Sequence, residues 1–385
     1  MTNRPAPNCE KSPRLSAVKK TLAATVALSA LLLTGCDLAA DPSPSPSASA
    51  SMSTGIELPA KPPATFLDRA AWKTSFSKEA RPAIGPAGVV AVAESGKALT
   101  LLNKDTGKAI WTTTDFPKVP TFSWVSINGR DWVVTTVKDG DKTTISSFDA
   151  AASGEALKPA ATATGTWQPV VAPNGVMLIS PDSAATWWPA TGELTQLTAL
   201  PARGEEKALP IAPVSGGFIL AYPTGGFLFS GDGQRWEPET VGPDPKKGKV
   251  LAVGTAYLIA EWDSKIALHS LRDGKVVATV PVGGIPANPL PIIRDNRWAV
   301  WGKYVFPLDG ASKDGKVLDQ GTPMAVYQDV LYAAGSTGQY TATDIPSGDL
   351  MGEPSAVGLV GLAGANGIFA FADGDGATLF GVPLR

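Results

Sequence analysis

Short apolar runs separated by glycine-containing turns recur along most of the chain, and residues 88–113 give the clearest example. The apolar residues 89–92 and 99–102 are separated by a polar segment, and a third run, which ends at Trp111, follows the turn at 104–108. Short apolar runs bounded by such turns are typical of β-strands joined in hairpins. This stretch therefore predicts three consecutive antiparallel strands.

The pattern repeats at a nearly constant spacing. In each repeat a glycine follows polar turn residues and precedes an apolar run, and successive glycines lie 33 to 47 residues apart. These glycines are Gly107, Gly154, Gly192, Gly233, Gly274, Gly315 and Gly348. The spacing is close to the length of a four-stranded propeller blade. The runs between them that we predict as strands are 132–137, 144–148, 176–179, 186–188, 218–222, 226–229, 256–261, 266–271, 298–301, 304–307, 330–334 and 339–345.

An eighth unit begins after Gly348 but lacks its last strand. Three apolar runs follow this glycine, and the chain ends at Arg385, where a fourth run is expected. The three runs are 359–363, 367–371 and 377–382. The missing strand has a counterpart near the other end, because residues 69–76 are similar to residues 108–116. A ring closed in this way has no full-length unpaired edge. We therefore predict an all-β fold, an eight-bladed β-propeller with seven blades as the alternative, whose last blade is closed by an N-terminal strand.

The first 35 residues have the features of a bacterial signal peptide. A basic segment that ends at Lys20 precedes an apolar stretch at residues 21–33, which is short for a membrane-spanning helix. Residues 33–36, Leu-Thr-Gly-Cys, resemble the lipobox of bacterial lipoproteins, in which the cysteine is acylated and the chain is cleaved before it. The resemblance implies a lipoprotein with a lipidated Cys36, and an uncleaved anchor is the alternative.

The rest of the chain divides into a tether and a globular part. Residues 36–63 are rich in Ser, Pro and Ala, a composition that has little to bury and favours an extended spacer. We therefore predict a signal peptide over residues 1–35, a lipidated cysteine and disordered tether over 36–63, and a single propeller domain over 64–385. The predicted location is the extracytoplasmic face of the cell membrane, where acyl chains on Cys36 would hold the protein.

The net charge, the two cysteines and the single histidine limit the partners and the chemistry that we expect. Cleavage before Cys36 would leave 28 basic and 34 acidic residues, a net charge of −6, which disfavours nucleic acid and anionic lipid surfaces. Both cysteines, Cys9 and Cys36, precede the predicted propeller, so no disulfide or thiolate metal site is expected within it. His269 is the only histidine, and it lies in an apolar run typical of a strand. Its neighbour Ser270 would point to the opposite face, which favours a packing role for the imidazole over catalysis.

The segment Leu-Thr-Leu-Leu-Asn-Lys-Asp-Thr-Gly-Lys-Ala-Ile-Trp, residues 99–111, resembles a repeat of the PQQ-like (quinoprotein alcohol dehydrogenase-like) β-propeller superfamily. Repeats of that superfamily carry an aspartate, a Thr-Gly-Lys turn and a tryptophan. The resemblance implies tryptophans that dock one blade onto the next, and Trp72, Trp111 and Gly107 are our candidates for this structural role. Enzymes of the superfamily bind pyrroloquinoline quinone with calcium. This chain lacks their cysteine pair and a recognisable ligand set, so we expect no cofactor.

Three other motifs have structural explanations. Residues 373–376, Asp-Gly-Asp-Gly, are not followed by the acids that would complete a calcium loop, and they predict a hairpin turn. Trp187 and Trp188 are adjacent, so at most one of them faces a given surface of a strand. Together with Trp298 and Trp301 they could form an exposed sugar or peptide site, but packing between blades is the simpler role.

From these features we expect a lipoprotein whose non-catalytic propeller serves as a scaffold or binding module, and we identify no catalytic, cofactor-binding or metal-binding residue. A protein or peptide partner would meet the loops at one mouth of the central channel, and we expect the chain to be a monomer. Two alternatives are open. One is a lyase or hydrolase that uses carboxylates at the channel, and the other is a carbohydrate-binding propeller.

Overall fold

The structure is a computed structural model that describes residues 55–180, 183–197, 200–231, 234–286, 290–373 and 376–385. The chain divides into two units, residues 1–52 and 53–385. The predicted signal peptide, Cys36 and most of the predicted tether lie outside the described residues. The second unit begins earlier than the boundary that we placed at residue 64, because residues 55–63 belong to it. Among the residues that are described, no helix has the length and hydropathy needed to cross a membrane.

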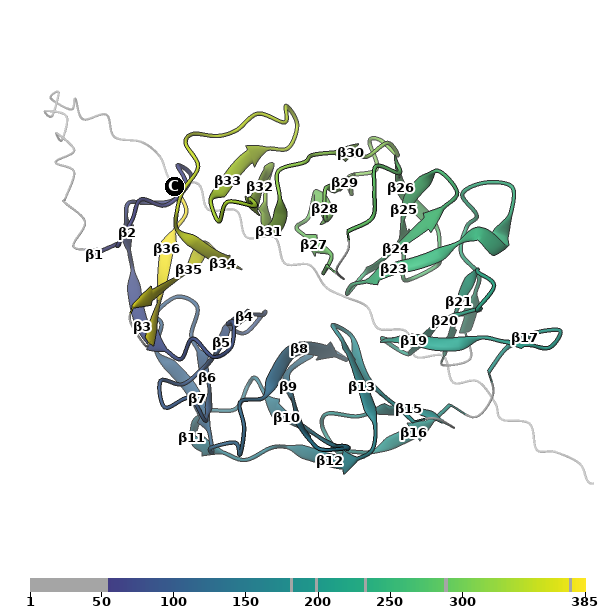
Figure 1. Ribbon diagram of the computed structural model, residues 1–385, viewed down its shortest axis with the longest axis horizontal. Helices are drawn as coiled ribbons and strands as arrows, with labels where there is room; N and C mark the ends of the chain where they lie inside the picture. Colours follow the sequence, from purple (N-terminus) through teal and green to yellow (C-terminus); the bar gives the residue numbers. More distant parts are fainter. Residues whose placement is uncertain (1–54, 181–182, 198–199, 232–233, 287–289, 374–375) are drawn as a thin grey trace, which may run out of the picture. The chain divides into compact units, whose positions relative to one another are not determined.

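The second unit is a ring of eight β-sheets, which we number as blades 1 to 8 (Figure 1). This arrangement confirms the predicted eight-bladed propeller, the fold that the resemblance to the PQQ-like superfamily implied. Blades 1 to 4 consist of β4 (Ala83–Ile84), β5 (Val89–Val92), β6 (Leu99–Leu102) and β7 (Ala109–Thr113); β8 (Thr121–Ile127), β9 (Arg130–Asp139), β10 (Lys142–Asp149) and β12 (Ala161–Gly165); β13 (Gln168–Ala172), β14 (Gly175–Ile179), β15 (Ala184–Trp187) and β16 (Leu194–Gln196); and β19 (Leu209–Val214), β20 (Gly217–Ala221), β21 (Phe227–Gly231) and β22 (Gln234–Trp236).

Blades 5 to 8 follow the same antiparallel order. They consist of β23 (Lys249–Val253), β24 (Tyr257–Trp262), β25 (Lys265–Ser270) and β26 (Val276–Pro281); β27 (Ile293–Arg294), β28 (Trp298–Trp301), β29 (Tyr304–Pro307) and β30 (Lys316–Val317); β31 (Thr322–Tyr327), β32 (Val330–Ala334) and β33 (Tyr340–Asp344); and β34 (Gly358–Ala363), β35 (Asn366–Asp373), β36 (Gly376–Pro383) and β3 (Trp72–Phe76). Blade 7 has isolated bridges from Leu350 and Ser355 in place of a fourth strand.

Short elements are added outside the blades. β11 (Gly154–Leu157) pairs in parallel with β7, so the link between two strands of blade 2 also joins the sheet of blade 1. β17 (Ala202–Arg203) and β18 (Glu206–Lys207) form a hairpin before blade 4, and a 3-10 turn at Pro245–Lys247 precedes blade 5. Gly154 thus begins a strand, and Gly315 lies beside β26 with its N–H donating to the Thr279 carbonyl at 2.8 Å. Gly315 directly precedes the last strand of blade 6, as in the pattern that we used to count repeats, whereas Gly154 belongs to the added strand β11. Gly233 lies outside the described residues.

An N-terminal strand closes the ring, as predicted. β3 pairs with the C-terminal β36 in a register that runs from Trp72 opposite Gly381 to Phe76 opposite Ala377. Residues 55–68, which we call the strap, precede this strand and contact blades 7 and 8. β1 (Ile56–Glu57) pairs with β2 (Arg69–Ala70), and the Tyr332 hydroxyl donates to Thr65 Oγ1 at 2.9 Å.

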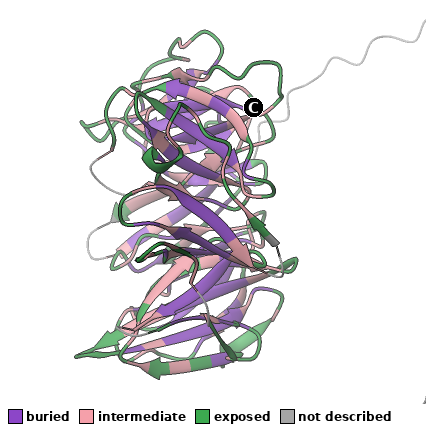
Figure 2. Ribbon diagram, turned by 90° about the vertical axis from the view of Figure 1, so that its right-hand side faces the viewer, coloured by how far each residue is buried: buried purple, intermediate pink, exposed green. Residues whose placement is uncertain are grey.

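A separate apolar cluster fills the space between many neighbouring blades. Between blades 1 and 2, for example, Val90, Leu101 and Trp111 pack with Val133 and Phe148. The middle strands are buried on both faces by the neighbouring blades, and they are therefore continuous apolar runs rather than alternating ones. Figure 2 shows this burial along the strands and the exposure of many of the turns.

The first strand of each blade faces the central channel and leaves one edge unpaired. Proline is tolerated on such an edge, as at Pro210 and Pro213 of β19 and at Pro323 of β31. Four first strands also shift register at the same place, where an extra residue bulges out of the ladder. The bulged residues are Ile211, Leu251, Met324 and Val360, and all four line the channel.

Candidate functional site

The predicted docking residues lie between blades. The indole of Trp72, in blade 8, packs on the turn of blade 1, where its Nε1 donates to the Lys104 carbonyl at 3.0 Å. Gly107 has a φ of 66°, and a Cβ atom there would lie 2.4 Å from the Trp72 ring. Trp111, in blade 1, packs against Phe148 of blade 2 with 6.1 Å between ring centroids. These residues therefore join three consecutive blades around the closure.

His269 lies inside blade 5 and is fully buried. Its Nε2 accepts a hydrogen bond from Trp262 Nε1 at 3.1 Å, and its Nδ1 lies 3.1 Å from the Gly274 carbonyl, to which it donates. Burial lowers the pKa of His269, although the Gly274 carbonyl and the charge of Glu239 act in the opposite direction. The neutral imidazole therefore stabilises the last turn of blade 5 through its hydrogen bond to Gly274.

The other sequence motifs lie in different surroundings. Trp187 is buried at 1% exposure, whereas Trp188 is 37% exposed. Trp301 is buried with its Nε1 donating to the Leu290 carbonyl, and Trp298 Nε1 donates to Asp329 Oδ1. The Asp-Gly-Asp-Gly segment joins β35 to β36, and its two middle residues lie outside the described chain.

The central channel contains two cavities of about 430 and 490 Å³. Their described lining is mainly apolar, with the two arginines Arg81 and Arg294 and no Asp or Glu among the described lining residues. Across the part of the chain that the structure describes, no three His, Cys, Asp or Glu side chains are grouped to share a metal ion.

On one face of the ring lie the turns that join first to second strands and third to fourth strands, and we call it the hairpin face. Hydrogen bonds connect several of these turns around the channel mouth. Asn174 Nδ2, in blade 3, donates to the Thr255 carbonyl of blade 5 at 2.6 Å. The Ser126 N–H of blade 2 donates to the Pro173 carbonyl at 2.7 Å, and Arg294 Nε of blade 6 donates to Thr255 Oγ1 at 3.4 Å. These bonds fix the positions of the turns on which the site depends.

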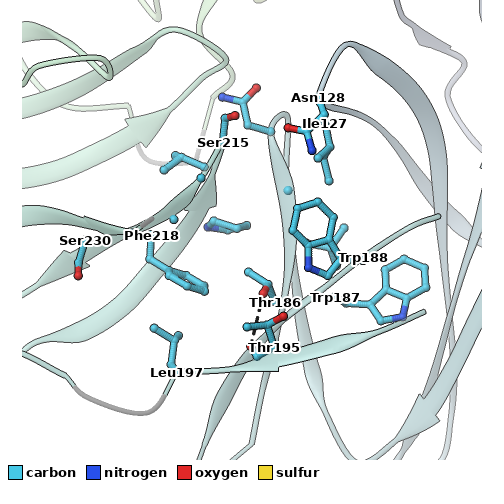
Figure 3. A pocket seen from close by; sticks show the side chains of 18 of the residues that line it. Ile127, Asn128, Thr186, Trp187, Trp188, Thr195, Leu197, Ser215, Phe218 and Ser230 are labelled. Carbon is cyan, nitrogen blue, oxygen red and sulfur yellow. Dashed lines mark hydrogen bonds between the residues drawn. The ribbon is translucent and has the colours of Figure 1, made fainter. Parts of the chain in front are cut away.

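A cleft of about 450 Å³ opens between blades 3 and 4 (Figure 3). Blade 3 contributes one wall through β15 and β16, and blade 4 contributes the opposite wall through its first hairpin and the end of β21. Asn128 of blade 2 lies at one end. The side chains that define the cleft are Asn128, Asn174, Thr186, Trp188, Thr195, Leu197, Ser215, Phe218 and Ser230.

Glycines explain why this space is open. A Cβ atom on Gly231 would lie 2.0 Å from the Gly216 carbonyl oxygen, and one on Gly217 would lie 2.5 Å from the Ser230 oxygen. The first hairpin of blade 4 and the end of β21 therefore pack backbone against backbone, as only glycine permits. No large side chain rises from these positions into the cleft.

The cleft combines an apolar floor with uncharged polar walls. Phe218 and Leu197 supply apolar surface and belong to the buried apolar cluster between blades 3 and 4. The polar side chains are amides and hydroxyls, and none of the described lining residues is ionisable. Asn128 and Ser215 have no side-chain hydrogen-bond partner within the described chain, so their donors and acceptors are available to a ligand.

Of the residues that line the cleft, only Trp187 and Trp188 were candidates from the sequence. The lining residues come from three blades, and no local motif brings them together. Two weak signals were present. Residues 215–217, Ser-Gly-Gly, indicate a close backbone approach, and Asn128 before Gly129 is typical of a tight hairpin turn, which it forms with a φ of 52°.

Comparisons with known proteins bear on the fold alone. No protein-family model matches the chain, and no curated protein matches it by sequence. Among solved structures, BamB from Moraxella catarrhalis is 11% identical with a TM-score of 0.48, and the alignment covers 81% of this chain and 99% of that one. The computationally designed Ika8 protein is 14% identical, with the same TM-score and the same coverage. Dihydro-heme d1 dehydrogenase NirN in complex with DHE is 15% identical with a TM-score of 0.48, over 81% of its own chain and 85% of this one.

Proposed function

We propose that this protein is a lipid-anchored, non-catalytic binding module of the extracytoplasmic face of the cell membrane. Its ligand or partner binds at the hairpin face, in the cleft between blades 3 and 4. In this proposal Cys36 carries the acyl chains, and the Ser/Pro/Ala-rich tether separates the propeller from the membrane. The propeller itself is a rigid support for the cleft.

The observation that carries the proposal is the cleft's chemistry. Its volume lies within the range of about 300–1,000 Å³ that is common for ligand sites, and its walls present free amides and hydroxyls. General acid–base catalysis uses a positioned titratable group. The described lining offers none, so the arrangement favours binding over catalysis at this site.

The rim offers an anchor for the protein or peptide partner that the sequence led us to expect. Trp188 lines the cleft and is 37% exposed. An exposed tryptophan next to a pocket is typical of binding surfaces. The uncharged walls of the cleft also suit a carbohydrate.

A photo-crosslinking experiment tests the location of the site. A photoreactive phenylalanine analogue would replace Trp188 in the full-length lipoprotein in its native membrane. The same analogue at Val317, which is 42% exposed on blade 6, is the control. We expect a defined adduct from position 188 only, and we expect Ser215→Trp, which fills the cleft, to abolish it. Equal adducts at both positions, or an adduct that survives the filled cleft, would contradict the proposal.

A further inference from the structure

Taking the cleft between blades 3 and 4 as the binding site proposed above, we infer that the group it binds is an uncharged saccharide. The inference rests on three properties of the cleft that point to one ligand class. They are the absence of charge from its described walls, the kind of polar group that it presents, and its aromatic surface.

The first property disfavours charged ligands. A charged group that leaves water must be paired or hydrogen-bonded to a counter-charge, because an unpaired buried charge is strongly unfavourable. The described cleft residues carry no Lys, Arg, His, Asp or Glu side chain. An acidic glycan, a nucleotide or a metal complex would lose hydration here without gaining an ion pair.

The second property disfavours a purely apolar ligand. Amides and hydroxyls that an apolar ligand covered would lose their water partners without replacement, at a considerable cost in free energy. Asn128 presents a donor and an acceptor, as do the hydroxyls of Ser215 and Thr195. Neighbouring hydroxyls of a sugar are also donors and acceptors at once, and they match this set.

The third property is aromatic surface beside the polar groups. Trp188 stands at the rim with 37% of its surface exposed, and Phe218 lies against the floor. A pyranose ring has a face of C–H groups as well as its hydroxyls, and burial of this face against an aromatic side chain is favourable. Trp188 and Phe218 line the same cleft as the polar side chains. A sugar can therefore pack its C–H face on an aromatic ring while its hydroxyls form hydrogen bonds with the polar side chains.

A peptide is the competing occupant, and the strand pairing argues against it. Extended peptides commonly bind by adding to an unpaired strand edge. The strands that carry Thr186, Phe218 and Ser230 are β15, β20 and β21, and each is paired on both sides. These walls are thus sheet faces that present side chains, and the outer edge of the three-residue strand β16 offers only a short stretch of unpaired backbone groups.

The test uses the full-length lipoprotein in detergent on an array of defined neutral and acidic glycans. Calorimetry with the best-bound glycan and with an uncharged peptide of Ser, Asn and Gly follows. We expect binding to neutral glycans only. We also expect Trp188→Ala to weaken that binding by at least about tenfold, a loss typical of an aromatic anchor. Trp188→Phe should retain most of the affinity, because it keeps an aromatic face.

Leu350→Ala is the matched control, since Leu350 is 51% exposed on blade 7 and lies outside the cleft. It should leave the affinity unchanged. Binding of no neutral glycan, binding of acidic glycans alone, or binding that Trp188→Ala does not weaken would overturn the inference. If the peptide binds in a Trp188-dependent way and no glycan does, the saccharide is wrong but the binding module stands. If no glycan and no peptide binds and the photoreactive residue at position 188 also forms no adduct, both the saccharide and the binding site in the cleft are refuted.

Discussion

At the scale of single residues, the side chains that reasoning about catalysis would examine first are structural. His269 is the only imidazole in the chain, and both of its ring nitrogens are occupied by hydrogen bonds within blade 5. Burial holds its pKa below the ordinary value of 6.5. Because the pKa of this base is lower in the folded state than in the unfolded chain, the free energy of unfolding should fall in acid.

We expect acid to destabilise the propeller through His269. Above about pH 6.5 the ring is neutral in both states, and its contribution to stability is fully present. As the pH falls below 6.5 toward the folded pKa, the unfolded chain takes up a proton and the folded chain does not. The free energy of unfolding should then fall by up to about 1.4 kcal/mol per pH unit.

Urea unfolding at pH 7.5, 6.5 and 5.5 measures this slope, and His269→Gln removes the imidazole. The slope of the wild type should exceed that of the variant between pH 6.5 and 5.5. The single histidine also gives one NMR signal for a direct titration. Parallel stability curves, or a titration midpoint at or above 6.5, would show that the buried ring does not control this window.

Gly107 is a second residue whose role is steric. A side chain there must adopt a φ of 66°, and its Cβ would lie 2.4 Å from the Trp72 ring, which is held by a hydrogen bond to Lys104. We expect Gly107→Ala to cost about 1–2 kcal/mol for the left-handed backbone. The clash should add about 1–3 kcal/mol. Gly140→Ala is the control, because its φ is 59° and a Cβ there meets nothing within 4 Å.

Chemical denaturation of both variants separates the two costs. Gly140→Ala should show the backbone cost alone. If the two substitutions destabilise equally, the contact between Trp72 and the turn contributes nothing to holding blade 8 against blade 1.

At the scale of elements, the strap is the segment that sequence patterns describe least well. Its composition resembles the tether, yet Phe66 is fully buried between Tyr332 and Phe369, with centroids 5.2 and 5.0 Å away. Phe66→Ala should therefore cost about 3–5 kcal/mol, as for a buried aromatic residue. Leu67→Ala, at the adjacent position with 42% exposure, should change stability by no more than about 0.5 kcal/mol.

Thermal unfolding of the two variants checks this difference. Equal melting temperatures for Phe66→Ala and Leu67→Ala would mean that the strap lies on blades 7 and 8 without stabilising them.

The strands that the sequence predicted and those that it did not differ in their surroundings. The middle strands, such as β24 and β25, are covered on both faces, so they are unbroken apolar runs and were predicted in place. The first strands border the channel, where proline and bulges are tolerated, and Pro210, Pro213 and Pro323 interrupt the usual signal.

The cleft could not be predicted from the sequence either. Asn128, Thr195 and Ser215 become neighbours only through the ring, and only Trp187 and Trp188 were candidates beforehand.

At the scale of the whole molecule, the proposed anchor and the closed ring make separate predictions. Cys36→Ala should release the protein from the membrane fraction or leave the signal peptide uncleaved, because the thiol that would accept the lipid is gone. Cys9→Ala is the matched control, since it lies in the segment that cleavage would remove. Fractionation and the mass of the N-terminal peptide measure both effects. Unchanged fractionation and mass in Cys36→Ala would refute the anchor.

The ring is closed without a covalent bond, because β3 and β36 come from opposite ends of the folded unit. Residues 77–385 alone would lose β3 and the strap, with the buried aromatic residues Trp72 and Phe76, each 4% exposed. At about 3–5 kcal/mol for each such residue, this loss is comparable to the whole stability of a typical domain, about 5–15 kcal/mol. We expect that fragment to lose cooperative unfolding.

A chain in which β3 follows β36 tests whether the ring needs only the pairing of these two strands or also the position of β3 before blade 1. Residues 53–76 would be moved behind Arg385 through a flexible linker of about 15 residues, which spans roughly 20 Å. If pairing of β3 with β36 holds the ring, this chain should melt close to residues 53–385 in one transition, and calorimetry would show it. A fragment 77–385 as stable as residues 53–385 would mean that the ring does not need its closing strand. A rearranged chain as unstable as the fragment would mean that closure depends on the N-terminal strand entering before blade 1.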